Sequence, residues 1–126
     1  MIDFDMDLQN MILTIRPSGP LSAHDFRLIA RRVDSVITKM GELPGLIVYG
    51  KSFPGWANFA SMLSHFRFIR DHHRLIKKVA VVSDAAALNI FPQITAHFIR
   101  AKLKHFHYSD YDAALDWIAE PEESHG

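Results

Sequence analysis

The sequence contains no cysteine and carries no net charge, with 14 Lys and Arg residues balancing 14 Asp and Glu residues over 126 positions. The missing cysteine excludes disulfides, thiolate catalysis and cysteine-ligated zinc. The balanced charge gives no reason to expect nucleic acid or an anionic membrane as a partner. No apolar run approaches the roughly 20 residues that cross a bilayer, and the Asp-rich start does not resemble a signal peptide. We therefore expect a cytoplasmic protein without an integral membrane segment.

The motifs that mark common enzymes are also missing. The chain has no Walker loop, no Gly-x-Gly-x-x-Gly and no Gly-x-Ser-x-Gly turn. His65 and His72 are spaced to share a helix face, but no carboxylate stands where it would complete a site with them. His105 and His107 share one face of an expected strand and could take part in a transition-metal site, although surface or packing roles fit them better. The sequence thus predicts no enzyme, no metal site and no cofactor.

The length and composition are those of one soluble globular domain. With 126 residues, 48% hydrophobic and 22% charged, the chain can bury a core without disulfides or a structural metal ion. No linker or repeat divides it. We expect a single domain over residues 1–120 and a polar tail over residues 121–126, where Pro121 stands among acidic residues.

The first part of the chain predicts a β-hairpin. Apolar residues alternate with Asp over residues 2–8, which is typical of a half-exposed strand. Gln9-Asn10 is a plausible tight turn, and Met11 to Arg16 then forms the second strand.

A helix should follow the hairpin. Ser22 and Asp25 form a capping-box signature at its start, and Gly41 lies where a C-terminal cap is expected. Its apolar stripe is Phe26, Ile29, Ala30, Val33, Val36, Ile37 and Met40. The basic face of Arg27, Arg31 and Arg32 is interpreted as a solvated helix face rather than a phosphate site.

The chain is organised around a central strand and the loop behind it. Leu46 to Tyr49 reads as a buried strand, Gly50 to Gly55 as a loop, and Asn58 as the cap of a helix that runs to His73. Ligands of open α/β sheets gather at the carboxyl ends of the strands. This loop is therefore the first place to look for a site.

The rest of the chain alternates strands with helices. Val79–Val82 reads as a strand buried on both faces, and a helix from Pro92 to about Arg100 follows. Residues 103–108 form a last strand, and a second capping-box pattern, Ser109 to Asp112, opens a final helix with Ala114, Leu115 and Ile118 inward. The predicted fold is α/β, a single mixed β-sheet with an opening hairpin, mainly parallel strands and about four helices.

These segments resemble the SpoIIAA-like proteins, whose fold is of the type found in STAS domains. The resemblance covers residues 2–118 and rests on five segments: Phe53-Pro-Gly-Trp56, His65-Phe-Arg-Phe68, Val79-Ala-Val-Val-Ser-Asp84, Ala101-Lys-Leu-Lys-His-Phe106 and Ala113-Ala-Leu-Asp-Trp-Ile118. It implies a small cytoplasmic α/β domain, often self-associating and without an established enzymatic activity. Some members are suspected of holding nonpolar or lipid-like molecules.

The related anti-sigma-factor antagonists carry a phosphorylatable serine after the central strand, and this chain departs from that pattern. Gly55-Trp56 occupies the region without the Asp-Ser pair, so Ser52 and Ser61 are only weak candidates for phosphorylation. Lys102 stands where relatives commonly carry an acid, so any role of that acid does not transfer.

Two hypotheses remain open. The leading one is a non-enzymatic binding domain that holds a nonpolar small molecule, because large apolar groups gather after the central strand. The candidate ligand-binding residues are Phe53, Trp56, Phe59, Met62, Phe66 and Phe68. The alternative is a protein-interaction module, homodimeric or partner-switching, in which Trp56 and Phe68 are contact residues.

Overall fold

The computed structural model describes residues 2–7, 9–17, 22–50, 76–85, 88 and 102–120. Its elements, in chain order, are β1 (Ile2–Asp7), β2 (Ile12–Pro17), α1 (Ala23–Met40), β3 (Leu43–Gly50), β4 (Ile76–Ser83), β5 (Lys102–His107), the 3₁₀ turn η3 (Tyr108–Asp110) and α5 (Tyr111–Ala119). Two α-helices thus stand in the described residues, and the expected count of about four is not supported. The other two predicted helices, over residues 58–73 and 92–100, lie outside the described residues.

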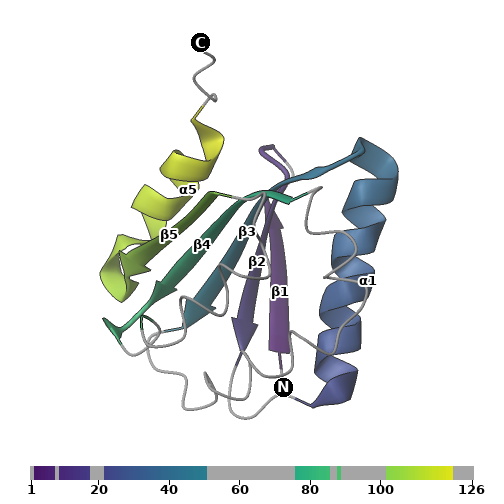
Figure 1. Ribbon diagram of the computed structural model, residues 1–126, viewed down its shortest axis with the longest axis horizontal. Helices are drawn as coiled ribbons and strands as arrows, with labels where there is room; N and C mark the ends of the chain where they lie inside the picture. The colour runs from purple at the N-terminus through teal and green to yellow at the C-terminus, as the bar shows by residue number, and fades with distance from the viewer. Residues whose placement is uncertain are drawn as a thin grey trace.

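The strands form one sheet in the order β1-β2-β3-β4-β5 (Figure 1). β1 runs antiparallel to β2, whereas β2, β3, β4 and β5 run parallel to one another. This confirms the predicted mixed sheet with its opening hairpin. The carboxyl ends of four parallel strands therefore lie along one border of the sheet.

The turn of the hairpin is held by Asp7. Its carboxylate accepts hydrogen bonds from the backbone N–H groups of Gln9 and Asn10, at 3.0 and 3.2 Å, and from the Asn10 side chain. These bonds hold the pKa of Asp7 below its usual value. Met11 closes the turn at φ 54°, a left-handed conformation uncommon outside glycine. The turn predicted at Gln9-Asn10 is confirmed.

Helix α1 has the boundaries that its caps predict. The Ser22 hydroxyl accepts the Asp25 backbone N–H, and the Asp25 carboxylate accepts that of Ser22, which completes the capping box. Gly41 ends the helix at φ 84°. The predicted stripe is buried at Ile29, Val33, Val36 and Ile37. It is wrong at Met40, which is 51% exposed, because this residue comes from the final turn, beyond the last buried residues.

The two faces of the sheet carry separate parts of the core. On one face, buried strand residues pack against Ala114 and Ile118 of α5, and these strand residues are Ile12, Ile47, Ala80 and Val82. On the other face lie the alternate buried residues Leu13, Ile15, Leu46, Val48, Val79 and Val81. Arg32 of α1 lies over Phe4, which pairs with Ile15, so α1 belongs to this second face. The predicted inward residues of the final helix are confirmed.

A buried lysine ties the sheet to the end of α5. Lys78 is only 5% exposed, and its Nζ donates to the main-chain oxygens of Trp117 and Glu120 at 2.7 and 3.1 Å. The ammonium also lies 5.2 Å from the centre of the Trp117 ring. A cation suits this position, because the last carbonyls of a helix lack partners within the helix and carry its negative dipole end.

In the described part of the chain, no helix is both long and apolar enough to span a bilayer.

Candidate functional site

All three tyrosines of the chain meet at the carboxyl border of the sheet. Tyr49 comes near the end of β3, Tyr108 begins η3 directly after β5, and Tyr111 begins α5. The rings of Tyr49 and Tyr108 are stacked, with centroids 5.2 Å apart and planes 10° apart. Tyr111 is tilted against Tyr49 at 4.7 Å. All three side chains are half-buried, so their rings remain available at the surface.

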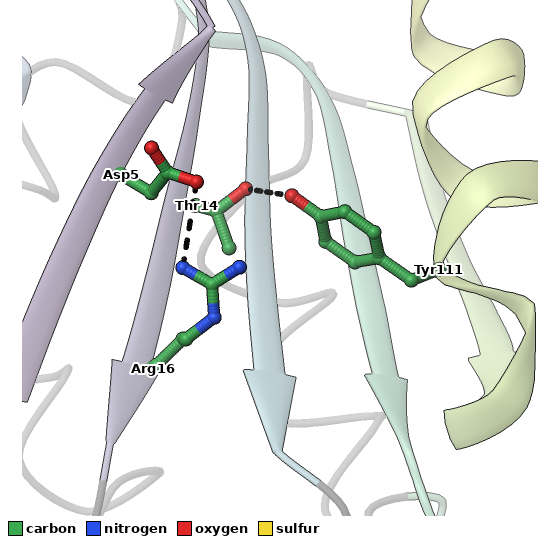
Figure 2. A network of polar contacts seen from close by, with 4 residues as sticks. All are labelled: Asp5, Thr14, Arg16 and Tyr111. Carbon is green, nitrogen blue, oxygen red and sulfur yellow. Dashed lines mark hydrogen bonds and ion pairs between the residues drawn. The ribbon is translucent and has the colours of Figure 1, made fainter.

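Arg16 of β2 extends this group toward the hairpin. Its guanidinium carbon lies 5.4 Å from the centre of the Tyr49 ring and 5.8 Å from that of Tyr111. Figure 2 shows the guanidinium facing the Asp5 carboxylate of β1, with an Nη1–Oδ2 distance of 3.6 Å. We call Arg16, Tyr49, Tyr108 and Tyr111 together the tyrosine–arginine surface.

Thr14 fixes one member of this surface. Its hydroxyl lies 2.9 Å from the Tyr111 hydroxyl, and Figure 2 shows the two side chains pointing toward each other from β2 and α5. Thr14 is itself 2% exposed. Because the bond joins residues 97 positions apart in the sequence, it locks the start of α5 onto β2 and sets the position of the Tyr111 ring.

The residues that cap the turn and the helix after β5 differ from the predicted capping box. His107 caps η3: its Nδ1 accepts the Ser109 backbone N–H at 3.1 Å and lies 2.8 Å from the Ser109 hydroxyl. The cap residue of α5 is Asp110, whose side chain makes no capping bond. The prediction that Ser109 and Asp112 open the helix is therefore wrong, because the 3₁₀ turn occupies Ser109 first. This turn places Tyr108 and Tyr111 on the same side as Tyr49.

The electrostatics of the surface favour binding over catalysis. A hydrogen bond with Tyr108 and, next, burial raise the pKa of Tyr49 above its ordinary value of 10.0, and the nearby Arg16 opposes this shift only in part. Tyr49 is thus neutral at physiological pH and poorly suited to act as a base or nucleophile. Neutral phenols and a guanidinium instead offer hydrogen-bond donors and ring faces.

A second polar cluster lies at the ends of β4 and β5. Nε2 of His105 lies 3.2 Å from the Ser83 hydroxyl and 3.1 Å from the main-chain oxygen of Asp84, and the Ser83 hydroxyl donates to that same oxygen. Ser83 is fully buried. Asp84 contributes its main-chain oxygen to these contacts. The cluster therefore links the ends of β4 and β5.

Within the described residues, the two histidines of β5 make separate polar contacts. Ser83 and Asp84 engage His105, and Ser109 engages His107. Over the described ranges, no group of three or more His, Asp or Glu side chains is arranged to hold a metal ion.

The residues that the sequence singled out are not those of this surface. Phe53, Trp56, Phe59, Met62, Phe66 and Phe68, together with Ser52 and Ser61, fall in residues 51–75, outside the described residues. The apolar site and the phosphorylation sites therefore stay predictions. Sequence reasoning missed the tyrosine–arginine surface. The usable signal was that Tyr49 and Tyr108 each stand at the end of a predicted strand, where sites of α/β sheets form.

The five-stranded sheet with its helices is a single-sheet α/β domain, consistent with the STAS type. A family model described as SpoIIAA-like matches residues 12–119, whereas no curated protein matches the chain. Because the match covers more than half of the chain, this chain belongs to the SpoIIAA-like family. The STAS fold often serves protein interactions, and the family is generally non-enzymatic.

Proposed function

We propose that this protein is a non-enzymatic protein-interaction domain that forms a homodimer through the tyrosine–arginine surface. One observation carries the proposal: every tyrosine of the chain, together with Arg16, is gathered on one half-buried patch. Tyrosine and arginine are enriched among the residues that dominate binding energy at protein interfaces. The roles common to the family agree with this function.

The surface is also pre-organised, which favours binding. Thr14 contacts the Tyr111 hydroxyl, Asp5 pairs with the Arg16 guanidinium, and the Tyr49 ring stacks on Tyr108 and contacts the tilted ring of Tyr111. Side chains already fixed in one rotamer lose less entropy when a partner covers them. The charge of Arg16 is matched by Asp5, so a partner needs no large opposite charge.

Sedimentation velocity over a concentration series tests the homodimer. We expect the wild type to dimerise, and Arg16→Gln and Tyr108→Ala each to weaken the dimer by about tenfold or more, as for residues worth over 1.4 kcal/mol. Lys102→Gln is the matched control, because Lys102 is exposed on β5, the last strand of the sheet. A wild type that stays monomeric at every concentration overturns the homodimer.

If the protein is a monomer, photo-cross-linking tests whether the tyrosine–arginine surface binds a different protein. A photoreactive amino acid is introduced at a single position for this purpose. Placed at Tyr108, it should capture one defined protein from cell extract, and the same residue at Lys102 should not. Capture that is equal at both positions, or absent at both, counts against a protein-binding role for this surface.

The nonpolar-ligand hypothesis is kept as the second candidate. Its support is the run of large apolar side chains from Phe53 to Phe68 in the sequence. Native mass spectrometry of fresh protein, followed by organic extraction, should then give a lipid-like adduct near one per chain. Trp56→Ala and Phe68→Ala should lose it, while Lys51→Ala should keep it. Equal retention by all three variants sinks this candidate. We place either function in one cytoplasmic domain over residues 1–120.

A further inference from the structure

A small pocket lies between the edge strand β1 and helix α1. Figure 1 shows that α1 and α5 lie on opposite sides of the sheet. The pocket has a volume of about 270 Å³ and is lined by Phe4, Leu28, Arg31, Arg32 and Ser35. Arg31 and Arg32 lie three and four positions after Leu28, and Ser35 lies four and three positions after them, so these residues share one side of α1. The pocket faces away from the tyrosine–arginine surface, because Phe4 and Asp5 point to opposite sides of β1.

The lining combines two positive charges with an apolar wall. Arg31 and Arg32 are both exposed, and neither makes an ion pair among the residues that the structure describes. The Arg32 guanidinium lies 5.2 Å from the centre of the Phe4 ring. A guanidinium over the face of a ring still has N–H groups that can bind an oxyanion.

The acidic residues of β1 do not neutralise this pocket. Asp3 and Asp5 alternate with Phe4 along the strand and so lie on the opposite face. Asp5 is paired there with Arg16. From the sequence, Arg31 and Arg32 are interpreted as part of a solvated helix face. Only the fold places Phe4 beside them.

We propose that this pocket binds a small organic anion, in which a carboxylate or phosphate group is attached to an aromatic body. Arg31 and the Ser35 hydroxyl hold the oxyanion, Arg32 adds a second charge, and Phe4 with Leu28 contacts the ring. Carboxylates and phosphates both suit arginine, which can bind either with two parallel hydrogen bonds. The size is adequate, because a cavity of about 150 Å³ already holds benzene.

The proposal is tested by titrating the isotope-labelled full chain with two probes, benzoate and phenyl phosphate, and following backbone amide NMR signals. We expect saturable shifts centred on Phe4, Arg31 and Ser35. Benzyl alcohol, which lacks the charge, and inorganic phosphate, which lacks the ring, should bind at least about tenfold more weakly. Absence of saturable shifts with both probes overturns the proposal, and so does inorganic phosphate binding as tightly as phenyl phosphate.

A pair of variants separates the pocket from general electrostatics. Arg31→Gln should weaken probe binding by about tenfold. Arg27→Gln, which removes an exposed arginine of the same helix outside the pocket, should leave it unchanged. Both substitutions keep a good helix former, so the fold is preserved. Equal weakening by the two variants means that net charge attracts the probe and overturns the site. Either outcome is independent of dimerisation through the tyrosine–arginine surface.

Discussion

Gly45 of β3 and Ile118 of α5 lie so close together that no side chain fits between them. A Cβ atom added to Gly45 would overlap Ile118 Cγ2 and lie 3.0 Å from its Cδ1 atom. Ala114, one helical turn before Ile118, is also small and completely buried. Small residues at this contact let α5 approach the sheet closely, and this approach brings Tyr111 to Thr14 and Tyr49.

Gly45→Ala should therefore destabilise the protein. The new methyl group must displace Ile118, and overpacking of this kind costs about 1–3 kcal/mol. Urea unfolding measures the loss in free energy. In the background of Ile118→Ala, which removes the overlapping atom, the same substitution should cost less, so the double-mutant cycle should show coupling. Additive losses would contradict the steric explanation.

Gly41→Ala provides a contrast with a different cause. Nothing lies within 4 Å of a Cβ added at Gly41, but its φ of 84° is strained for a residue with a side chain. We expect a loss of about 1 kcal/mol, which Ile118→Ala does not relieve. Gly41→Asn should lose less than Gly41→Ala, because asparagine tolerates the left-handed conformation. Urea unfolding of the wild type, Gly41→Ala and Gly41→Asn measures these losses in the free energy of unfolding.

Lys78→Met should loosen the end of α5. Methionine keeps the buried apolar stem but removes the donor to the main-chain oxygens of Trp117 and Glu120. We expect about 1–3 kcal/mol of destabilisation and faster amide hydrogen exchange at the end of α5. The neighbouring Lys77→Met is the control. Lys77 makes a 3.5 Å exposed ion pair with Glu42, a type worth about 0–1 kcal/mol. Equal losses would argue against the role of Lys78.

Stability should fall at alkaline pH because of Tyr49. Its pKa in the folded state is raised above 10.0, chiefly by the hydrogen bond with Tyr108. As the pH rises, the unfolded chain therefore loses the Tyr49 proton before the folded protein does. The contribution of Tyr49 to folding stability is complete below pH 10 and is lost as the pH rises through the pKa of the folded state. Tyrosinate absorbance should show one tyrosine titrating late, and Tyr108→Phe should bring it back toward the ordinary value. An unchanged titration in Tyr108→Phe would contradict the assignment.

At the acid end, Asp25 should contribute a stability that disappears as the pH falls. The backbone N–H of Ser22 lowers its pKa below 3.8, with a smaller contribution from the Ser22 hydroxyl. Because the pKa of Asp25 is lower in the folded than in the unfolded protein, the ionised carboxylate stabilises the fold at pH values above the unfolded pKa. This stabilisation is lost as the pH falls below about 4 and passes through the pKa of the folded state. Unfolding between pH 5 and 2 should be less pH-dependent in Asp25→Asn than in the wild type. Asp34→Asn, at an exposed position of the same helix outside the capping box, is the control.

Much of the fold follows from local patterns. The period-two alternation before Gln9 predicted the hairpin, and Ser22, Asp25 and Gly41 predicted both ends of α1. Local patterns failed at two helix ends. Met40 continues the apolar stripe of α1 beyond its last buried residue. Asp110, not Ser109, holds the capping position of α5, because Ser109 lies in the 3₁₀ turn that His107 caps.

The candidate site was less accessible to sequence reasoning. The rule that sites form at the carboxyl ends of strands directed attention to the end of β3, but large apolar residues after it drew the prediction to residues 53–68. The tyrosines are far apart in the chain, and nothing in their spacing shows that Tyr49 stacks on Tyr108. Parallel pairing of β3, β4 and β5 brings them together, because it aligns the strand ends along one border.

The sequence alone determined much of the core, both caps of α1 and the family, because these depend on side-chain type and short-range spacing. The tertiary structure decided which polar side chains meet. The register of β1 on β2 puts Asp5 and Arg16 on one face and Phe4, beside Arg32, on the other. The missing side chain of Gly45 sets how closely α5 approaches. Such long-range placements depend on packing between elements, which no local sequence pattern specifies.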